Sequence, residues 1–217
     1  MAAVGGQSAQ GGGTGRESAP IEFRDAVEAL TGARLRPEVR LSPQPAPRRL
    51  APYSFALSAS VEVDGEELAD GTLVLLHDPS APEAWNGDFR VVTMTRAELE
   101  PEMAGDPVLS EVGWSWLLDA LQAHAAGYAE PSGTVTRCHS QYFGALAERG
   151  SSTEIELRAS WTPADHRFER HLAAWADLLC GCAGLPPSAP AQLPADGPGV
   201  LGGVVPMPAR RRPRNSH

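Results

Sequence analysis

Thiol and imidazole side chains are the groups in this sequence that could hold a metal ion. They occur as Cys138-His139 and Cys180-Gly181-Cys182, and sulfur and imidazole ligands suit zinc. Zinc ligands usually come in pairs two to four residues apart on turns, whereas Cys138 and His139 point to opposite faces of a predicted strand. Cys180 and Cys182 lie near the end of a predicted helix. We therefore expect reduced, structural thiols, no metal and no cofactor, with a Cys/His metal-binding protein or enzyme as an alternative.

Other residues of catalytic type do not form a recognisable pattern. Ser160 and Asp165-His166 have the residue types of a hydrolase triad, but the G-x-S-x-G turn that exposes such a serine does not occur. All 18 basic residues are arginines, which excludes lysine Schiff-base chemistry and the phosphate-loop lysine. We predict no catalytic residues and favour a protein that is not an enzyme.

Charge divides the chain into an acidic centre and a basic end. Residues 20–186 contain 25 acidic side chains and 13 arginines, whereas the C-terminus ends in ARRRPRN. Between residues 50 and 89 there are eight acidic side chains and no arginine. Such a surface repels phosphate backbones, so nucleic acid is not the expected partner of the central region. An RNA-linked accessory role through the basic tail remains an alternative.

Composition predicts one domain between two tails. We expect a disordered Gly/Ser-rich tail over residues 1–19, a single domain over 20–186, and a disordered Pro-rich tail with a basic end over 187–217. No apolar run approaches the ~18 residues that span a bilayer. The N-terminus has neither a basic start nor a continuous apolar segment, so a cytoplasmic protein without a membrane anchor is expected.

Three helices are predicted from apolar residues at helical spacing. The most apolar spans 106–126, with Asp106 as its N-cap, and should be largely buried. Its expected inner stripe is Val112, Trp116, Ala120 and Leu121, widened by Trp114, Leu117 and Leu118. A short helix with Phe23, Ala26, Val27 and Leu30 on one face precedes it. The last helix runs from Asp165 to about Gly181, with Phe168, Leu172, Trp175 and Leu179 on one stripe.

Five strands are predicted from alternation and β propensity: 53–63, 72–77, 89–95, 133–143 and 153–162. The odd-numbered side chains of 53–63 are apolar and should be buried by the helices at 106–126 and 165–181. Between the first helix and the first strand, residues 33–52 should run extended as a strap, with at most a brief strand at 35–41. The predicted fold is α+β: a five-stranded antiparallel sheet packed on helices, in the order helix, three strands, helix, two strands, helix.

The runs ELEPEMAGDPVLSEVGWSWLLDAL (98–121), GTVTR (133–137) and ELRASWTP (156–163) resemble the actinobacterial domain of unknown function family numbered three thousand. This resemblance, over about residues 20–185, implies a cytoplasmic protein without an assigned activity or catalytic residues. The element order is also similar to that of type III secretion chaperone-like folds. Those proteins pack one antiparallel sheet on helices, pair through an exposed surface, and bind an extended client segment.

The second face of strand 53–63 suggests a binding surface. Small side chains such as Ser54, Ser58 and Ser60 would leave it flat, and the predicted helices suffice to cover the other face only. We therefore predict a non-catalytic, chaperone-like adaptor that binds a protein or peptide, with a homodimer or a basic client as candidate assemblies. A monomer whose own strap covers this face is the alternative. The predicted interaction residues are Ser54, Ser58, Ser60, Glu62, Glu66, Glu67, Arg34, Arg36, Arg48 and Arg49.

Overall fold

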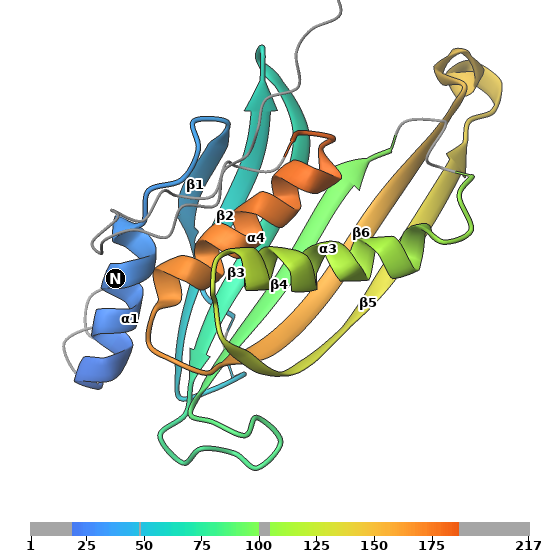
Figure 1. The fold of residues 1–217 in the computed structure, drawn as a ribbon. Coiled ribbons are helices and arrows are strands. Elements are labelled where there is room, and N and C mark those ends of the chain that lie inside the picture. Colours follow the sequence, from blue (N-terminus) through green and yellow to red (C-terminus); the bar gives the residue numbers. More distant parts are fainter. Residues whose placement is uncertain (1–18, 48, 100–104, 187–217) are drawn as a thin grey trace, which may run out of the picture.

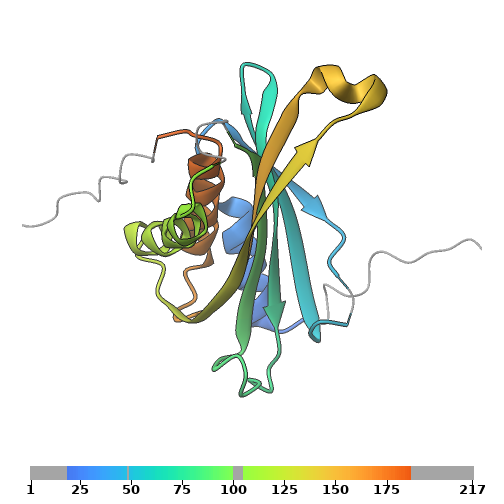
Figure 2. The same cartoon turned by 90° about the vertical axis from the view of Figure 1, so that its right-hand side faces the viewer.

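The computed structural model describes residues 19–47, 49–99 and 105–186, and shows one antiparallel sheet with helices on one face (Figures 1 and 2). Six strands lie in the order β1-β2-β3-β4-β6-β5. The predicted α+β class and antiparallel pairing are confirmed, but the predicted number of five strands is wrong. The strands are β1 (Val39–Gln44), β2 (Tyr53–Val63), β3 (Glu66–His77), β4 (Phe89–Glu98), β5 (Tyr128–Gln141) and β6 (Ser151–Pro163).

The additional strand, β1, comes from the predicted strap. It pairs antiparallel with β2 from Val39↔Val61 to Gln44↔Ala56, and so extends the sheet sideways. Pro43 is compatible with this position, because an edge strand has one side without a ladder partner and a missing N–H can face that side. Strand β1 is held by its pairing with β2, and the strap has no alternation of apolar and polar residues that would indicate a strand. The sequence therefore predicted only a brief strand here.

The strands are longer than predicted, most clearly at β3. Asp64 and Gly65 have φ values of 54° and 87°, the two positive values that a tight two-residue hairpin requires. The turn is therefore restricted to these two residues, and β3 begins at Glu66 instead of residue 72. The predicted start of this strand at residue 72 is therefore wrong.

Three α-helices are described: α1 (Ile21–Gly32), α3 (Leu109–Ala123) and α4 (Phe168–Cys182); a 3-10 helix, η1 (Gly144–Arg149), joins β5 to β6. The predicted stripe of α4 is confirmed, because all four of its members are buried: Phe168, Leu172, Trp175 and Leu179. The predicted start of this helix at Asp165 is wrong, because Arg167 is the N-cap. Asp165 Oδ1 accepts the backbone N–H of Arg167 at 3.0 Å, which closes the turn before the helix.

The orientation of α3 corrects the predicted inner stripe. Its buried residues are Leu109, Gly113, Leu117 and Leu121, whereas Val112 is exposed and Trp116 is half-buried. Gly113 explains this choice, because its lack of a side chain lets the helix approach the sheet: a Cβ there would lie 3.2 Å from Ile155 Cδ1. Asp106 is also not the N-cap. Val108 takes that place, and Asp106 Oδ1 accepts the Val108 N–H at 3.0 Å.

The core lies between the helices and the odd-numbered side chains of the sheet. The odd face of β2 is buried as predicted, but α4 packs on this strand, whereas α3 packs on β5. The largest fully buried side chains of the core are Trp161 on β6, and Trp175 and Phe168 on α4. Trp175 Nε1 donates to Thr95 Oγ1 at 3.1 Å, so helix α4 is hydrogen-bonded to the centre of β4. Among the helices in the described part of the chain, none is long and apolar enough to cross a membrane.

Candidate functional site

The even-numbered side chains of the strands form the face of the sheet opposite the α-helices, and we call this the even face. One row across it reads Ser42, Ser58, Thr72, Met94, Arg158 and Thr134 from β1 to β5. Figure 2 shows the described α-helices gathered on the other side of the sheet. Every side chain in the central row is half-buried or exposed, so the middle of a broad sheet faces outward.

The three predicted serines all lie on the even face. Ser54 Oγ donates to Pro47 O at 3.2 Å, and Ser58 Oγ accepts from Gln44 Nε2 at 3.0 Å. Ser60 Oγ donates to Glu62 Oε1 at 3.2 Å. Their hydroxyl groups are thus bonded within the chain, and the serines provide a flat surface rather than reactive groups.

The strap covers one end of the even face. Ala56, Val74 and Leu76 are buried there, and partly buried apolar side chains pack against them: Ala46, Ala51, Trp85 and Val92. The part of the strap from Val39 to Gln44 lies beside β2 as strand β1. The alternative in which the chain covers its own small-residue face therefore holds for one end, while the central rows remain accessible.

Charges of alternating sign cross the even face next to the central row. Asp70 is paired in register with Arg96, and Arg96 with Glu156. Glu156 accepts from Arg158 Nε at 2.7 Å and from Arg96 Nε at 2.8 Å. The hydrogen bond from Arg158 and, to a lesser extent, the one from Arg96 lower the pKa of Glu156. The charges in this part of the even face are therefore mixed in sign. The predicted residues Glu66 and Glu67 lie elsewhere, at the start of β3, where both are exposed.

The predicted arginines are not gathered at one place. Arg36 Nε is 3.0 Å from Glu38 Oε2, and Arg36 Nη1 donates to Pro186 O at 2.9 Å. Arg40 Nε lies 3.4 Å from Glu62 Oε2. Arg49 is exposed, and Arg48 is outside the described residues. Arg34 lies on the helical side of the molecule, where it lines a groove.

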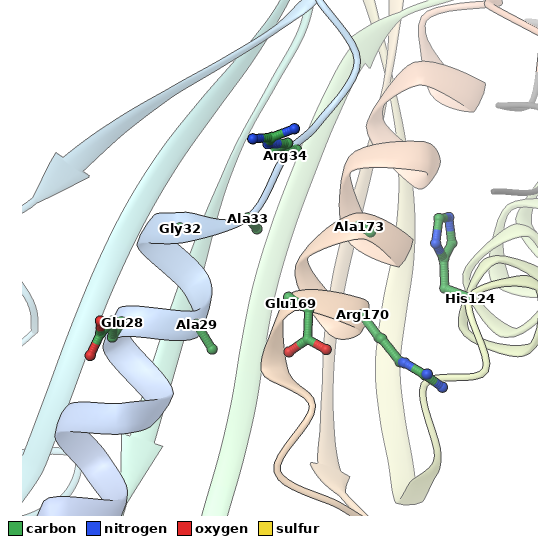
Figure 3. Close-up of a pocket in the computed structure, with 9 residues that line it drawn as sticks. All are labelled: Glu28, Ala29, Gly32, Ala33, Arg34, His124, Glu169, Arg170 and Ala173. Atoms are coloured by element: carbon green, nitrogen blue, oxygen red, sulfur yellow. The ribbon is translucent and has the colours of Figure 1, made fainter. Parts of the chain in front are cut away.

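This groove, of about 530 Å³, lies between α1, α4 and the end of α3 (Figure 3). Figure 3 shows Glu28, Ala29 and Gly32 of α1 on one side and Ala173 of α4 on the other. Small side chains form its floor, and its charged lining has both signs, from Glu28, Arg34, Glu169 and Arg170. The lining therefore does not favour a ligand of one charge.

His124, which lines the groove, forms a His–Asp pair that sequence reasoning missed. His124 Nε2 is 2.6 Å from Asp177 Oδ2, and both side chains are partly buried. Such a carboxylate can orient an imidazole for proton transfer. However, none of the described residues that line the groove is a serine, threonine or cysteine, so the groove itself offers the pair no nucleophile of these types. The two members of the pair are 53 residues apart in the sequence, and only the packing of α3 on α4 brings them together.

The thiols occupy separate environments. Cys180 and Cys182 are buried in the core, and burial raises their pKa to about 11 and about 12. Cys138 is exposed on β5. The neighbouring His139 forms a hydrogen bond between its Nδ1 and Thr153 Oγ1 at 2.9 Å. Within residues 19–47, 49–99 and 105–186, no group of three or more His, Cys, Asp or Glu side chains is placed to hold a metal ion.

A family model described as "Protein of unknown function (DUF3000)" matches residues 19–191. No curated protein and no solved structure matches the chain. The predicted order of helix, three strands, helix, two strands, helix is wrong, because four strands follow the first helix. The expected similarity to type III secretion chaperone-like folds was based on that order, which would in any case describe a fold and not an activity.

Proposed function

Because the chain belongs to the DUF3000 family, whose description assigns no activity, we propose from the structure that it is a non-catalytic protein-binding module. The binding surface is the even face, and its first partner is a second copy of the same chain. The accessible centre of this face is the observation that carries the proposal. A sheet in a small domain is usually covered where apolar surface has to be buried, and an accessible, flat centre suits contact with another protein.

The dimensions of the even face suit a standard interface. Six strands spaced about 4.8 Å apart span about 24 Å, and ten residues of strand span about 33 Å. The resulting area of about 800 Å² is comparable with the area that each partner contributes to a stable complex of standard size, and the accessible part is smaller because one end is covered. Side chains as small as Ser58 and Thr72 permit close approach over the centre.

The charges favour a second copy as the partner. Asp70 on β3 and Arg96 on β4 occupy neighbouring central strands of the sheet. Consider a twofold axis in the plane of the interface that runs along the strands, between β3 and β4. This axis places β3 of each copy over β4 of the other and brings Asp70 of each copy opposite Arg96 of the other. Closed dimers use such self-complementary surfaces. This arrangement uses the even face alone, and the strap residues Arg36 and Arg40 keep their partners in their own chain.

Reversing one of these charges should dissociate the dimer. Asp70→Arg places arginine against Arg96 of the second copy, and like charges facing across an interface cost several kcal/mol, so association should weaken about 100-fold. The double variant Asp70→Arg, Arg96→Asp should associate again. Sedimentation velocity over a micromolar dilution series, with circular dichroism to verify folding, measures both results.

Asp119→Arg is the matched control, since it makes the same change of charge at an exposed position of α3. It should leave the dimer intact. A wild-type protein that is a monomer throughout the dilution series would contradict the proposal. So would a dimer that dissociates in Asp119→Arg and persists in Asp70→Arg, because the helical layer would then be the interface.

A further inference from the structure

Arg90 is a nearly buried cation at the edge of the even face. Only 8% of the residue is exposed. Nη1 donates to Thr162 Oγ1 at 3.0 Å, and Nη2 donates to Ser160 Oγ at 2.9 Å and Ser132 Oγ at 3.1 Å. The guanidinium therefore links β4 to β6 and β5 through three hydroxyl groups.

The charge of Arg90 has no counter-ion in contact. Among the described residues, no carboxylate oxygen lies within 4 Å of the guanidinium nitrogens. Burial lowers the pKa of Arg90, and Glu130 opposes this only from a distance. Buried charges are usually paired, because the loss of hydration is costly. An arginine surrounded by neutral hydroxyl groups therefore retains the capacity to attract an anion.

The hydroxyl groups leave one donor for such an anion. Thr162 Oγ1 donates its proton to the carbonyl oxygen of Trp85. Ser132 Oγ and Ser160 Oγ are 3.1 Å apart, and one donates to the other while both accept from Arg90. The second serine proton is therefore not used by these bonds. Ser132 is exposed and Ser160 is half-buried, so Ser132 is the hydroxyl that can present this proton outward.

We propose that Ser132 and Ser160, with Arg90 directly behind them, form a binding site for a carboxylate group. An oxygen of the ligand's carboxylate accepts a hydrogen bond from the free serine hydroxyl. The guanidinium, which is hydrogen-bonded to the same serine, supplies the positive charge. A carboxylate fits better than a phosphate dianion, because the site has one positive charge and Glu130 is a nearby negative one. The proposal does not depend on the even face binding a protein, since a small carboxylate can occupy the site by itself.

Acetate titration followed by NMR tests the site, with acetamide as the neutral probe of the same shape and ionic strength held constant. Acetate should shift the Arg90 side-chain N–H signals and the Ser132 amide signal to saturation, whereas acetamide should not. Ser132→Ala should weaken acetate binding about tenfold, because it removes a hydrogen bond to a charged group. Thr134→Ala, two residues further along β5 on the same face, should leave the affinity unchanged.

A variant that binds acetate more tightly provides a second test, because a loss of folding can only weaken binding. Glu130→Gln removes the negative charge near Arg90 and should bind acetate more tightly than the wild type. Inorganic phosphate should bind no more tightly than acetate, and tighter phosphate binding would overturn the assignment to a carboxylate. Shifts that do not saturate, or that are the same in Ser132→Ala and Glu130→Gln, would show that Arg90 only ties the strands together.

Discussion

Replacing Trp175 with alanine should lower the free energy of unfolding by about 3–5 kcal/mol. Its side chain is fully buried between α4 and the sheet. Gly71 provides space for the indole, since a Cβ at that glycine would lie 2.8 Å from Trp175 Cζ2. The variant would create a cavity and remove the hydrogen bond to Thr95 Oγ1. Urea unfolding followed by far-ultraviolet circular dichroism measures the change.

Trp116→Ala is the matched control for the packing of the helices. Trp116 is half-buried on α3, so the same substitution removes less buried surface and should cost about 1–2 kcal/mol. Equal costs for the two variants would contradict the observed orientation of α3. A larger cost for Trp116 would restore the inner stripe expected from the sequence.

The protein should lose about 3 kcal/mol of stability between pH 6.5 and pH 4 through His171 alone. Burial lowers the pKa of this fully buried ring from 6.5 to about 4, with Asp165 opposing the shift. Because the folded state binds the proton less readily than the unfolded state, the stabilising contribution is complete above pH 6.5. It decreases as the pH falls and reaches its minimum below pH 4. Urea unfolding at a series of pH values measures this slope.

The hydrogen bonds of His171 explain why protonation is unfavourable. Nδ1 accepts from Trp161 Nε1 at 3.0 Å, so it would have to lose this bond to take up a proton. Nε2 is buried without a hydrogen-bond partner among the described residues. His171→Asn retains an acceptor but does not titrate, and should give a shallower loss of stability over this pH range. Identical slopes in the two proteins would show that His171 is not the group responsible.

Local patterns in the sequence predicted the part of the fold that depends on burial within single elements. Alternation along 53–63 identified the buried face of β2, and the spacing of Phe168, Leu172 and Leu179 identified the buried stripe of α4. In both elements, apolar and polar residues are on separate faces. The side that packs inward is then determined by composition alone.

The elements that were predicted incorrectly lack this separation. α3 is apolar on several sides, so its orientation is determined by the close approach of Gly113 to Ile155, which no periodicity reveals. Strand β1 is held by its register with β2. Both features depend on contacts between segments that are distant in the sequence.

The candidate binding surface was predictable only in outline. Alternation along β2 correctly placed Ser54, Ser58 and Ser60 on the face opposite the buried one, whereas their role in binding stays a prediction. Arg90, in contrast, obtains its hydroxyl partners from residues 42 to 72 positions further along the chain. Neighbouring residues in the sequence give no indication of this cluster, because it forms only when β4, β5 and β6 lie side by side.

Met94 reports directly on whether the even face is an interface, because it lies in the central row of that face and is half-buried. The measurement is the broadening of its methyl NMR signal by a soluble paramagnetic agent over a dilution series, with the signal assigned from Met94→Leu. We predict weak broadening at high concentration, where the second copy covers the methyl group, and strong broadening on dilution. Strong broadening that is the same at every concentration would contradict the proposal that copies of this chain pair through the even face.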